Sequence, residues 1–187
     1  ARTAEIPMSF WVWNHPAALS PQEQTALREA RATRLYWHVA DLRWQAGSWQ
    51  IEGKVQPLPR MDFVEIVPVF RLHAEVESAD GEFSELGKRL TSFALQFAAK
   101  EIQIDYDCPE SALMRYARGL EICRAALRPA RLTATALAGW IDLPAFNVLA
   151  CSVDGLCPMF YDLETDEPDA VRRGQFVPIT DSSRDKH

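Results

Sequence analysis

The chain has 187 residues, 48% of them hydrophobic and 25% charged, a composition typical of one soluble globular domain. Its 20 Lys and Arg side chains against 26 Asp and Glu give a net charge of −6, which argues against nucleic acid as a partner. No apolar run approaches the ~20 residues of a membrane-spanning helix, so a transmembrane segment is excluded.

The N-terminal half alternates strands with one helix and a hairpin. In chain order, the predicted elements are a strand over residues 8–14, a helix over 21–31, a strand over 33–39, a β-hairpin insertion over 43–53 with a Gly-Ser turn, and a strand over 64–72. Ser20 and Glu23 have capping-box spacing, with Pro21 at the first helical position. Pro68 is unfavourable in a central strand.

The C-terminal half continues the alternation. The predicted elements are a helix over residues 84–99, a strand over 101–107, a helix over 113–127, a strand over 131–137, a short helix over 140–150 interrupted near Pro144, and a strand over 156–162. The 84–99 helix is predicted from apolar residues that recur at three- and four-residue steps from Phe83 to Phe97. Residues 164–187 are acidic and polar and predict a tail.

Strands that alternate with helices predict an α/β fold with a parallel sheet and right-handed crossovers. No G-x-G-x-x-G or G-x-x-x-x-G-K-[ST] motif follows any strand, so a (β/α) TIM-barrel-like fold is favoured over a nucleotide-binding sheet, and no cofactor is expected. About six strands are predicted, whereas a complete barrel takes about 250 residues. We therefore expect an incomplete barrel over residues 1–163. The alternatives are a barrel that a partner or a second copy completes and a chain that is truncated.

The strand over residues 101–107 carries the candidate site. Side chains alternate across a strand, so Gln103, Asp105 and Asp107 share one face. In a barrel the apolar face of this strand meets the helices, and the carboxylates point into the interior near the end of the strand where barrel enzymes place their sites. Their mutual repulsion predicts a raised pKa for at least one of them, as a proton donor requires.

Asp107 also has a purely structural interpretation. It lies three residues before Glu110, which is the spacing of a capping box at the start of the next helix. Asp105 lies too early in the chain to cap that helix. The functional interpretation therefore depends more on Asp105.

Two motifs resemble a known family of glycosidases. The segment IQIDYDCPE (102–110) and the segment MFYD (159–162) are similar to the fourth and sixth strands of glycoside hydrolase family 18 barrels, with motifs D-x-x-D-x-D-x-E and M-x-Y-D. The segments FWVW, RLYWHV, IDYDCP and LTATAL, with the following Trp140, resemble a bacterial family catalogued as domain of unknown function 3142. This resemblance covers about residues 8–162 and implies no activity.

The family 18 motif departs at its catalytic position. If Asp105 and Asp107 take the two inner Asp positions, the acid position falls on Pro109, which cannot donate a proton. A register slipped by two residues makes Asp107 the acid and Asp105 the group that orients a substrate acetamide. The resemblance then implies that Tyr161 and Asp162 contact the sugar and that no enzymic nucleophile is needed. A degenerate relative that only binds sugar is equally compatible with Pro109.

Further candidate ligands come from aromatic and basic residues. Indole faces suit the apolar sides of sugar rings, and Trp13, Trp37 and Trp140 lie in or just after predicted strands, although core packing is the alternative. Trp11 shares a strand face with Trp13. Arg71, near the end of the third strand, either neutralises the central carboxylates or holds an anionic substituent on a sugar.

Two rival chemistries have some support in the sequence. His15, His38 and His73, with Asp105, would form a mixed metal site, but there is no H-x-H and isolated histidines more often pack, so no metal is predicted. Cys108 is placed at a helix N-terminus, which would lower its thiol pKa, but no His is evidently beside it. No G-x-S-x-G motif is present.

The cysteines and the N-terminus bear on location. Cys108, Cys123, Cys151 and Cys157 include no C-x-x-C pair, so they indicate neither a zinc site nor a redox motif, and both disulfides and free thiols stay open. The chain starts at Ala1 and lacks a charged segment followed by an apolar leader. Removal of an export signal and trimming of the chain would both produce such a start. We expect a periplasmic or exported protein, with the cytoplasm as the alternative.

Taken together, the sequence predicts a glycosidase-like barrel that hydrolyses or binds a bacterial amino-sugar polysaccharide. Asp105 and Asp107 are the candidate catalytic residues. The expected ligand contacts are Trp13, Trp37, Arg71, Gln103, Trp140, Tyr161 and Asp162. The alternatives are a non-catalytic carbohydrate-binding or envelope scaffold domain and a metal-dependent hydrolase or deacetylase.

Overall fold

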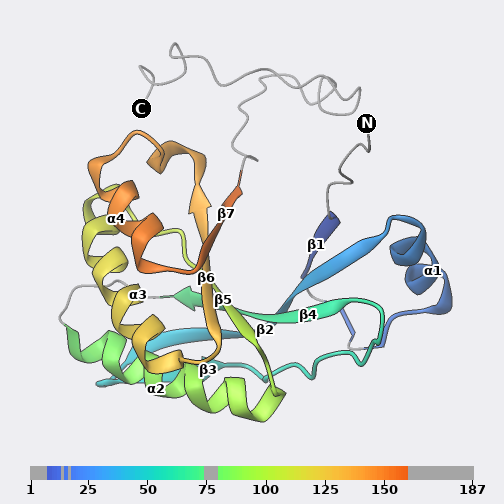
Figure 1. Ribbon diagram of the computed structural model, residues 1–187. Helices are drawn as coiled ribbons and strands as arrows, with labels where there is room; N and C mark the ends of the chain where they lie inside the picture. The colour runs from blue at the N-terminus through green and yellow to red at the C-terminus, as the bar shows by residue number, and fades with distance from the viewer. Residues whose placement is uncertain (1–7, 14, 17, 74–79, 160–187) are drawn as a thin grey trace.

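The computed structural model describes residues 8–13, 15–16, 18–73 and 80–159. Parallel strands pair in the order β1-β2-β4-β5-β6-β7, which follows the chain. Their bounds are Met8–Val12 (β1), Ala32–Gln45 (β2), Glu65–His73 (β4), Glu101–Asp105 (β5), Arg131–Leu137 (β6) and Gly155–Met159 (β7). The sheet curls, as Figure 1 shows. A curled parallel sheet with strands in chain order is part of a (β/α) barrel, which confirms the predicted fold class.

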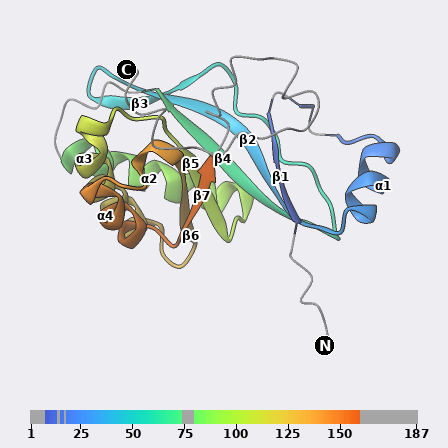
Figure 2. The same ribbon diagram turned by 90° about the horizontal axis from the view of Figure 1, so that it is seen from above.

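The helices follow the strands as predicted. Their bounds are Pro21–Glu29 (α1), Asp80–Phe97 (α2), Leu113–Leu127 (α3) and Pro144–Ser152 (α4), with single 3₁₀ turns at Glu110–Ala112 and Ala138–Trp140. In both views α2, α3 and α4 lie together on one side of the sheet, and α1 stands apart beyond β1 and β2 (Figures 1 and 2). Ser20 forms the predicted capping box with Glu23. Pro144 begins α4 and does not interrupt it, since a proline is well suited to the first helical position.

The predicted hairpin insertion is confirmed, but its turn differs. β2 pairs antiparallel with β3 (Ser48–Glu52), and Gln45 lies opposite Ser48. The turn is therefore Ala46-Gly47 and not Gly-Ser, with φ values of 51° and 77°. Positive φ at both positions is what a two-residue hairpin needs to match strand twist.

β2 is longer than predicted, and a bulge interrupts it. The prediction ended at Val39, but the strand runs on to Gln45 because its second half forms the hairpin. The register with β4 shifts between His38 and Ala40. A bulge adds one residue to one strand, so His38 and Asp41 both face the same side although they are three residues apart.

Pro68 is accommodated inside β4. It lies opposite Trp37 of β2, whereas the pairing with β5 begins one residue later, at Val69. No β5 residue therefore stands in register with the proline, and the sheet loses little where a ladder hydrogen bond is missing.

The predicted alternation along β5 is confirmed. Ile102 and Ile104 belong to the buried hydrophobic core that includes side chains of α2 and α3. Gln103 and Asp105 face the other, concave side, where Thr133 and Thr135 of β6 lie beside them in the sheet. The concave side of the sheet is therefore the polar interior of the partial barrel.

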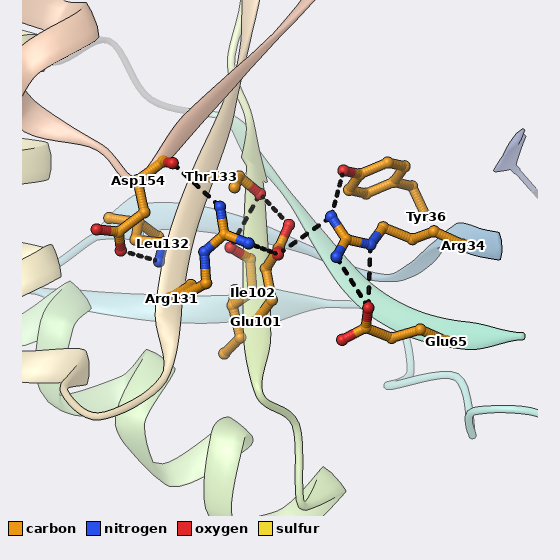
Figure 3. A network of polar contacts seen from close by, with 9 residues as sticks. All are labelled: Arg34, Tyr36, Glu65, Glu101, Ile102, Arg131, Leu132, Thr133 and Asp154. Atoms are coloured by element: carbon orange, nitrogen blue, oxygen red, sulfur yellow. Dashed lines mark hydrogen bonds and ion pairs between the residues drawn. The ribbon is translucent and has the colours of Figure 1, made fainter. Parts of the chain in front are cut away.

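The N-terminal ends of the strands are joined by an ionic network, drawn in Figure 3. Glu101 lies at its centre, 2% exposed, with its Oε2 atom 3.3 Å from a guanidinium nitrogen of both Arg34 and Arg131. Thr133 donates a hydrogen bond to Oε1 of Glu101 at 3.0 Å. Arg34 also donates two hydrogen bonds to Glu65. The network links β2, β4, β5 and β6 at the end of the barrel opposite the candidate site.

Two predictions concern residues outside this description. The tail, residues 164–187, and the end of the predicted last strand, residues 160–162, lie outside the described residues. Within the described part, none of the helices combines the length and the hydropathy needed to span a bilayer.

Candidate functional site

Three charged residues form a row across the concave face at the C-terminal edge of the strands. Asp41 of β2 is in register with Arg71 of β4, and Arg71 is in register with Asp105 of β5. Neighbouring strands are about 4.8 Å apart, so the row places a cation between two acids. The C-terminal edge is where barrel enzymes place their reacting groups.

Asp105 is the buried carboxyl of this row. Its side chain is 6% exposed, Thr135 donates a hydrogen bond to its Oδ1 at 2.9 Å, and Nε of Arg71 lies 3.8 Å from its Oδ2. Burial raises the pKa of Asp105, and the nearby carboxylates of Asp107 and Asp41 raise it further, while the Thr135 hydrogen bond and Arg71 oppose them. The predicted raised pKa is thus present, but burial is a larger cause than repulsion between Asp105 and Asp107.

Asp107 follows β5 and lies at the open edge of the partial barrel. Its side chain is 47% exposed, and Nη2 of Arg71 lies 3.9 Å from its Oδ2. It does not cap the following helix: the residue at the N-cap of the 3₁₀ turn is Pro109, and neither that turn nor α3 has a side-chain cap. The structural interpretation of Asp107 is therefore wrong, and its carboxylate is available at the edge of the barrel.

Trp13 forms one wall beside this row. Its ring lies 4.4 Å from the His38 ring, centroid to centroid, and the Arg71 guanidinium carbon lies 5.9 Å from its centroid. Trp11, on the same strand face, meets it edge-on at 5.5 Å. An indole half-buried at the edge of the site, next to a cation and two carboxylates, is suitably placed to stack on a sugar ring.

Asp41 belongs to this row although no sequence pattern predicts it. Nε2 of His73 donates a hydrogen bond to its Oδ1 at 2.8 Å, and Nε2 of His38 lies 3.5 Å from its Oδ2. Burial lowers the pKa of His38, which the Asp41 carboxylate opposes. No sequence signal identifies Asp41, because a strictly alternating strand would place it on the face opposite His38.

Gln103 lies one step below Asp105 on the same face of β5. It is fully buried, and neither Oε1 nor Nε2 has a hydrogen-bond partner among the described residues. A buried amide without partners is costly, so such a group points to a bound water or ligand. Gln103 therefore faces the interior as predicted.

Two of the other predicted ligand contacts, Trp37 and Trp140, are not brought to this edge. Trp37 and Trp140 are both buried within the hydrophobic core, and Trp140 packs edge-on against Tyr116 of α3. Their indole faces are occupied by protein, which corrects the prediction that they line the site. Tyr161 and Asp162 lie outside the described residues.

The metal site predicted from the histidines is not assembled, because His15 lies away from the other candidate ligands. His15 is hydrogen-bonded to Glu23 of α1 at 2.8 Å and does not join His38 and His73. Across the ranges described above, no group of three or more His, Cys, Asp or Glu side chains is arranged to hold a metal ion. The arrangement proposed from the histidines is therefore not formed.

The cysteine alternative is also corrected. Cys108 is buried, and burial raises the pKa of its thiol to about 12, so the expected lowering at a helix N-terminus does not occur. Cys108, Cys123, Cys151 and Cys157 are all free thiols. A thiol with a raised pKa is a poor nucleophile at neutral pH.

We expect Asp105→Asn to stabilise the protein at neutral pH. Because the folded-state pKa of Asp105 is raised, the folded state is penalised once the unfolded chain ionises this carboxyl, above about pH 4. The asparagine cannot ionise, and its amide oxygen can still accept the Thr135 hydrogen bond. Urea unfolding from pH 3 to pH 7 should show equal free energies of unfolding at low pH and a growing advantage for the variant as the pH rises. The prediction is contradicted if the free energy of unfolding of the variant, relative to that of the wild type, falls between pH 3 and pH 7.

Comparison with known proteins supports the architecture. A solved structure similar to this chain is that of the Bacillus cereus spore cortex-lytic enzyme SleL, with a TM-score of 0.51 and 12% sequence identity. The match covers 84% of this chain and 42% of that one, so the present chain spans less than half the length of its structural neighbour. No family model and no curated protein matches, so the resemblance to domain of unknown function 3142 stays a prediction. At this identity the likeness shows the fold alone: the chain shares the barrel architecture of a spore cortex-lytic enzyme.

Proposed function

We propose that this chain is a glycosidase-like barrel protein that binds and hydrolyses a bacterial amino-sugar polysaccharide at the C-terminal edge of β4 and β5. The observation that carries the proposal is the group formed there by Asp105, Asp107 and Arg71 on the concave face. The shared fold with a spore cortex-lytic enzyme and the resemblance of IQIDYDCPE to family 18 motifs support the same substrate class.

The proposed roles follow from the slipped family 18 register, and the exposure of each side chain is consistent with them. Asp107 is exposed at the mouth and donates the proton to the leaving oxygen of the glycosidic bond. Asp105, behind it, orients the acetamide of the substrate, with Gln103 below as a second polar contact. Trp13 stacks on a sugar ring. Arg71 lies near both carboxylates without a hydrogen bond to either, at 3.8 and 3.9 Å, and neutralises part of their charge.

One observation favours a second candidate, a non-catalytic carbohydrate-binding or envelope scaffold domain. In the unslipped family 18 register the acid position is Pro109, which has no ionisable side chain and begins the 3₁₀ turn after β5. A barrel that lost its acid would keep the wall of Trp13, Arg71 and Asp105 and still hold a glycan.

Turnover and binding measurements distinguish the two. We expect the wild type and Asp62→Asn to cleave a member of an amino-sugar glycan panel, with Asp107→Asn at least about 100-fold slower but still binding. Asp62 is a matched control because its side chain is 93% exposed, in the loop that precedes β4 at the other end of the strands. Binding without turnover in all three proteins supports the scaffold. If the wild type shows no binding and no turnover, a carbohydrate function is refuted.

The edges of the sheet suggest how the barrel closes. Among the described residues, β1 and β7 each have a neighbouring strand on one side only. Such open edges carry unpaired backbone groups that other strands can extend. The proposal includes closure of the barrel by a partner or a second copy, and light scattering tests whether the chain forms oligomers. It also includes an exported location, which cell fractionation tests.

A further inference from the structure

The hydrogen bond from Thr135 to Asp105 is a feature of the site that the proposed roles do not use. Thr135 lies on β6, is fully buried, and donates to Oδ1 of Asp105 at 2.9 Å. The two side chains are neighbours because Ile104 and Ala134, the residues that precede them, are in register across β5 and β6. A hydrogen bond to a carboxylate is stronger than one between neutral groups, and burial shields it from solvent.

The hydroxyl of Thr135 has little freedom to turn away from Asp105. Threonine is branched at Cβ, so its side chain is restricted to few rotamers in a strand. The backbone is held as well, since β6 lies between β5 and β7, with Cys157 of β7 in register with Thr135. A donor fixed in this way also fixes the orientation of the carboxyl group to which it donates.

This hydrogen bond distinguishes the two oxygens of the Asp105 carboxyl. Thr135 occupies Oδ1, whereas Nε of Arg71 lies 3.8 Å from Oδ2, which is beyond hydrogen-bond distance. Oδ2 therefore keeps capacity to accept a hydrogen bond from a substrate. The same guanidinium lies 3.9 Å from the carboxylate of Asp107, so Oδ2 is on the side of the site where the proposed acid lies.

The hydrogen bond also acts on the charge of Asp105. Burial raises the pKa of this carboxyl, and the hydrogen bond from Thr135 opposes that rise. The ionised form is the one that accepts a hydrogen bond from the N–H of an acetamide through either oxygen. The other ionisable groups that interact with this carboxyl come from several elements: Asp41 of β2, Arg71 of β4, Asp107 after β5, Tyr116 of α3 and Cys157 of β7.

We infer that Thr135 is the positioning residue for Asp105 in the proposed hydrolysis, because it holds Oδ1 and leaves Oδ2 directed toward the substrate acetamide. The inference rests on the proposed function. Thr135 acts only through Asp105: it contacts no reacting atom, and no bond to it forms or breaks. The role belongs to its hydroxyl group and not to its bulk, and this distinction can be measured.

The first test follows the ionisation of Asp105 and needs no substrate. Carbon NMR of protein labelled at the Asp carboxyl carbons, with the signal assigned through Asp105→Asn, gives the pH at which this group loses its proton. Thr135→Val keeps the shape of the side chain without the hydroxyl, so this pH should rise. Thr135→Ser keeps the hydroxyl and should stay close to the wild type.

The matched control is Thr133→Val. Thr133 lies two residues earlier on the same face of β6, but its hydroxyl donates to Glu101 and to the carbonyl of Ile102. Thr133→Val should therefore leave the ionisation of Asp105 unchanged, although it removes a hydrogen bond from the ionic network.

The second test is turnover of an N-acetylated amino-sugar glycan that the wild type cleaves. Thr135→Val should lower kcat about tenfold or more and move the acidic limb of the pH profile to higher pH, and Thr135→Ser should recover most of the loss. Thr133→Val should keep the wild-type pH profile. Thermal melting shows which variants are folded, and Thr135→Ala, which also lacks the hydroxyl, replaces Thr135→Val if the latter does not fold.

The outcomes separate this inference from the proposed function. If the wild type cleaves a glycan but a folded Thr135→Val keeps its kcat, its pH profile or its Asp105 titration, the inference is overturned and the proposed function stands. Thr135→Ser with the same loss as Thr135→Val also overturns the inference, because packing would then be the cause. A wild type that cleaves no glycan overturns both.

Discussion

Replacing Glu101 with alanine is expected to lower the free energy of unfolding by about 3 kcal/mol or more. The carboxylate is buried, accepts a hydrogen bond from Thr133 and lies 3.3 Å from both Arg34 and Arg131 (Figure 3). Removing it leaves two guanidinium groups close together without their shared anion. Urea unfolding at pH 7 measures the loss.

The matched control is Glu65→Ala, which removes an exposed carboxylate from the same network. Glu65 accepts hydrogen bonds from Arg34 at 2.8 and 3.2 Å, but its side chain is 41% exposed, so the loss should be about 1 kcal/mol or less. Added salt should reduce the effect of Glu65 more than that of Glu101. Equal losses for the two variants would show that burial of Glu101 contributes nothing to stability.

Replacing Trp140 with alanine should cost about 3–5 kcal/mol of unfolding free energy, since a large buried side chain leaves a cavity that the core fills only in part. Trp140 is 2% exposed and packs against Tyr116 of α3. Trp13→Ala should cost much less stability, because this ring is only partly buried, yet it should weaken glycan binding if the proposed function holds.

The comparison of the two tryptophans therefore separates core from site. The free energy of unfolding and the glycan affinity are both measured at a temperature where both variants are folded. Trp140→Ala should lower the free energy of unfolding more than Trp13→Ala does, and Trp13→Ala should lower glycan affinity more than Trp140→Ala does. A Trp140→Ala protein as stable as the wild type would mean that the core does not depend on this ring. A Trp13→Ala protein with unchanged affinity would remove Trp13 from the site.

Local patterns predicted the elements of this fold well. The capping box at Ser20 formed because both of its partners lie within one turn of chain. The alternation of Ile102 and Ile104 with Gln103 and Asp105 showed which face of β5 is polar, since a strand has a period of two wherever it is placed. Both signals depend only on neighbours in the sequence.

Other features depend on residues distant in the sequence. Asp107 and Glu110 have capping-box spacing, but the chain after β5 enters a 3₁₀ turn at Pro109 and leaves Asp107 beside Arg71. Trp13 and Trp37 are both aromatic residues in predicted strands, yet one lies beside the site and the other in the core. Composition does not distinguish them, because burial depends on which face of the sheet the helices cover.

By itself, the sequence determined the alternation of strands and helices, the hairpin insertion and the acidic face of β5, because these follow from the local spacing of apolar and polar residues. Only the tertiary structure decided that Asp41 joins the site. That outcome needs one extra residue in β2, the register of β2, β4 and β5, and the hydrogen bond from His73, a residue 32 positions away. Pairing between distant strands is a property of the whole sheet, and no local period encodes it.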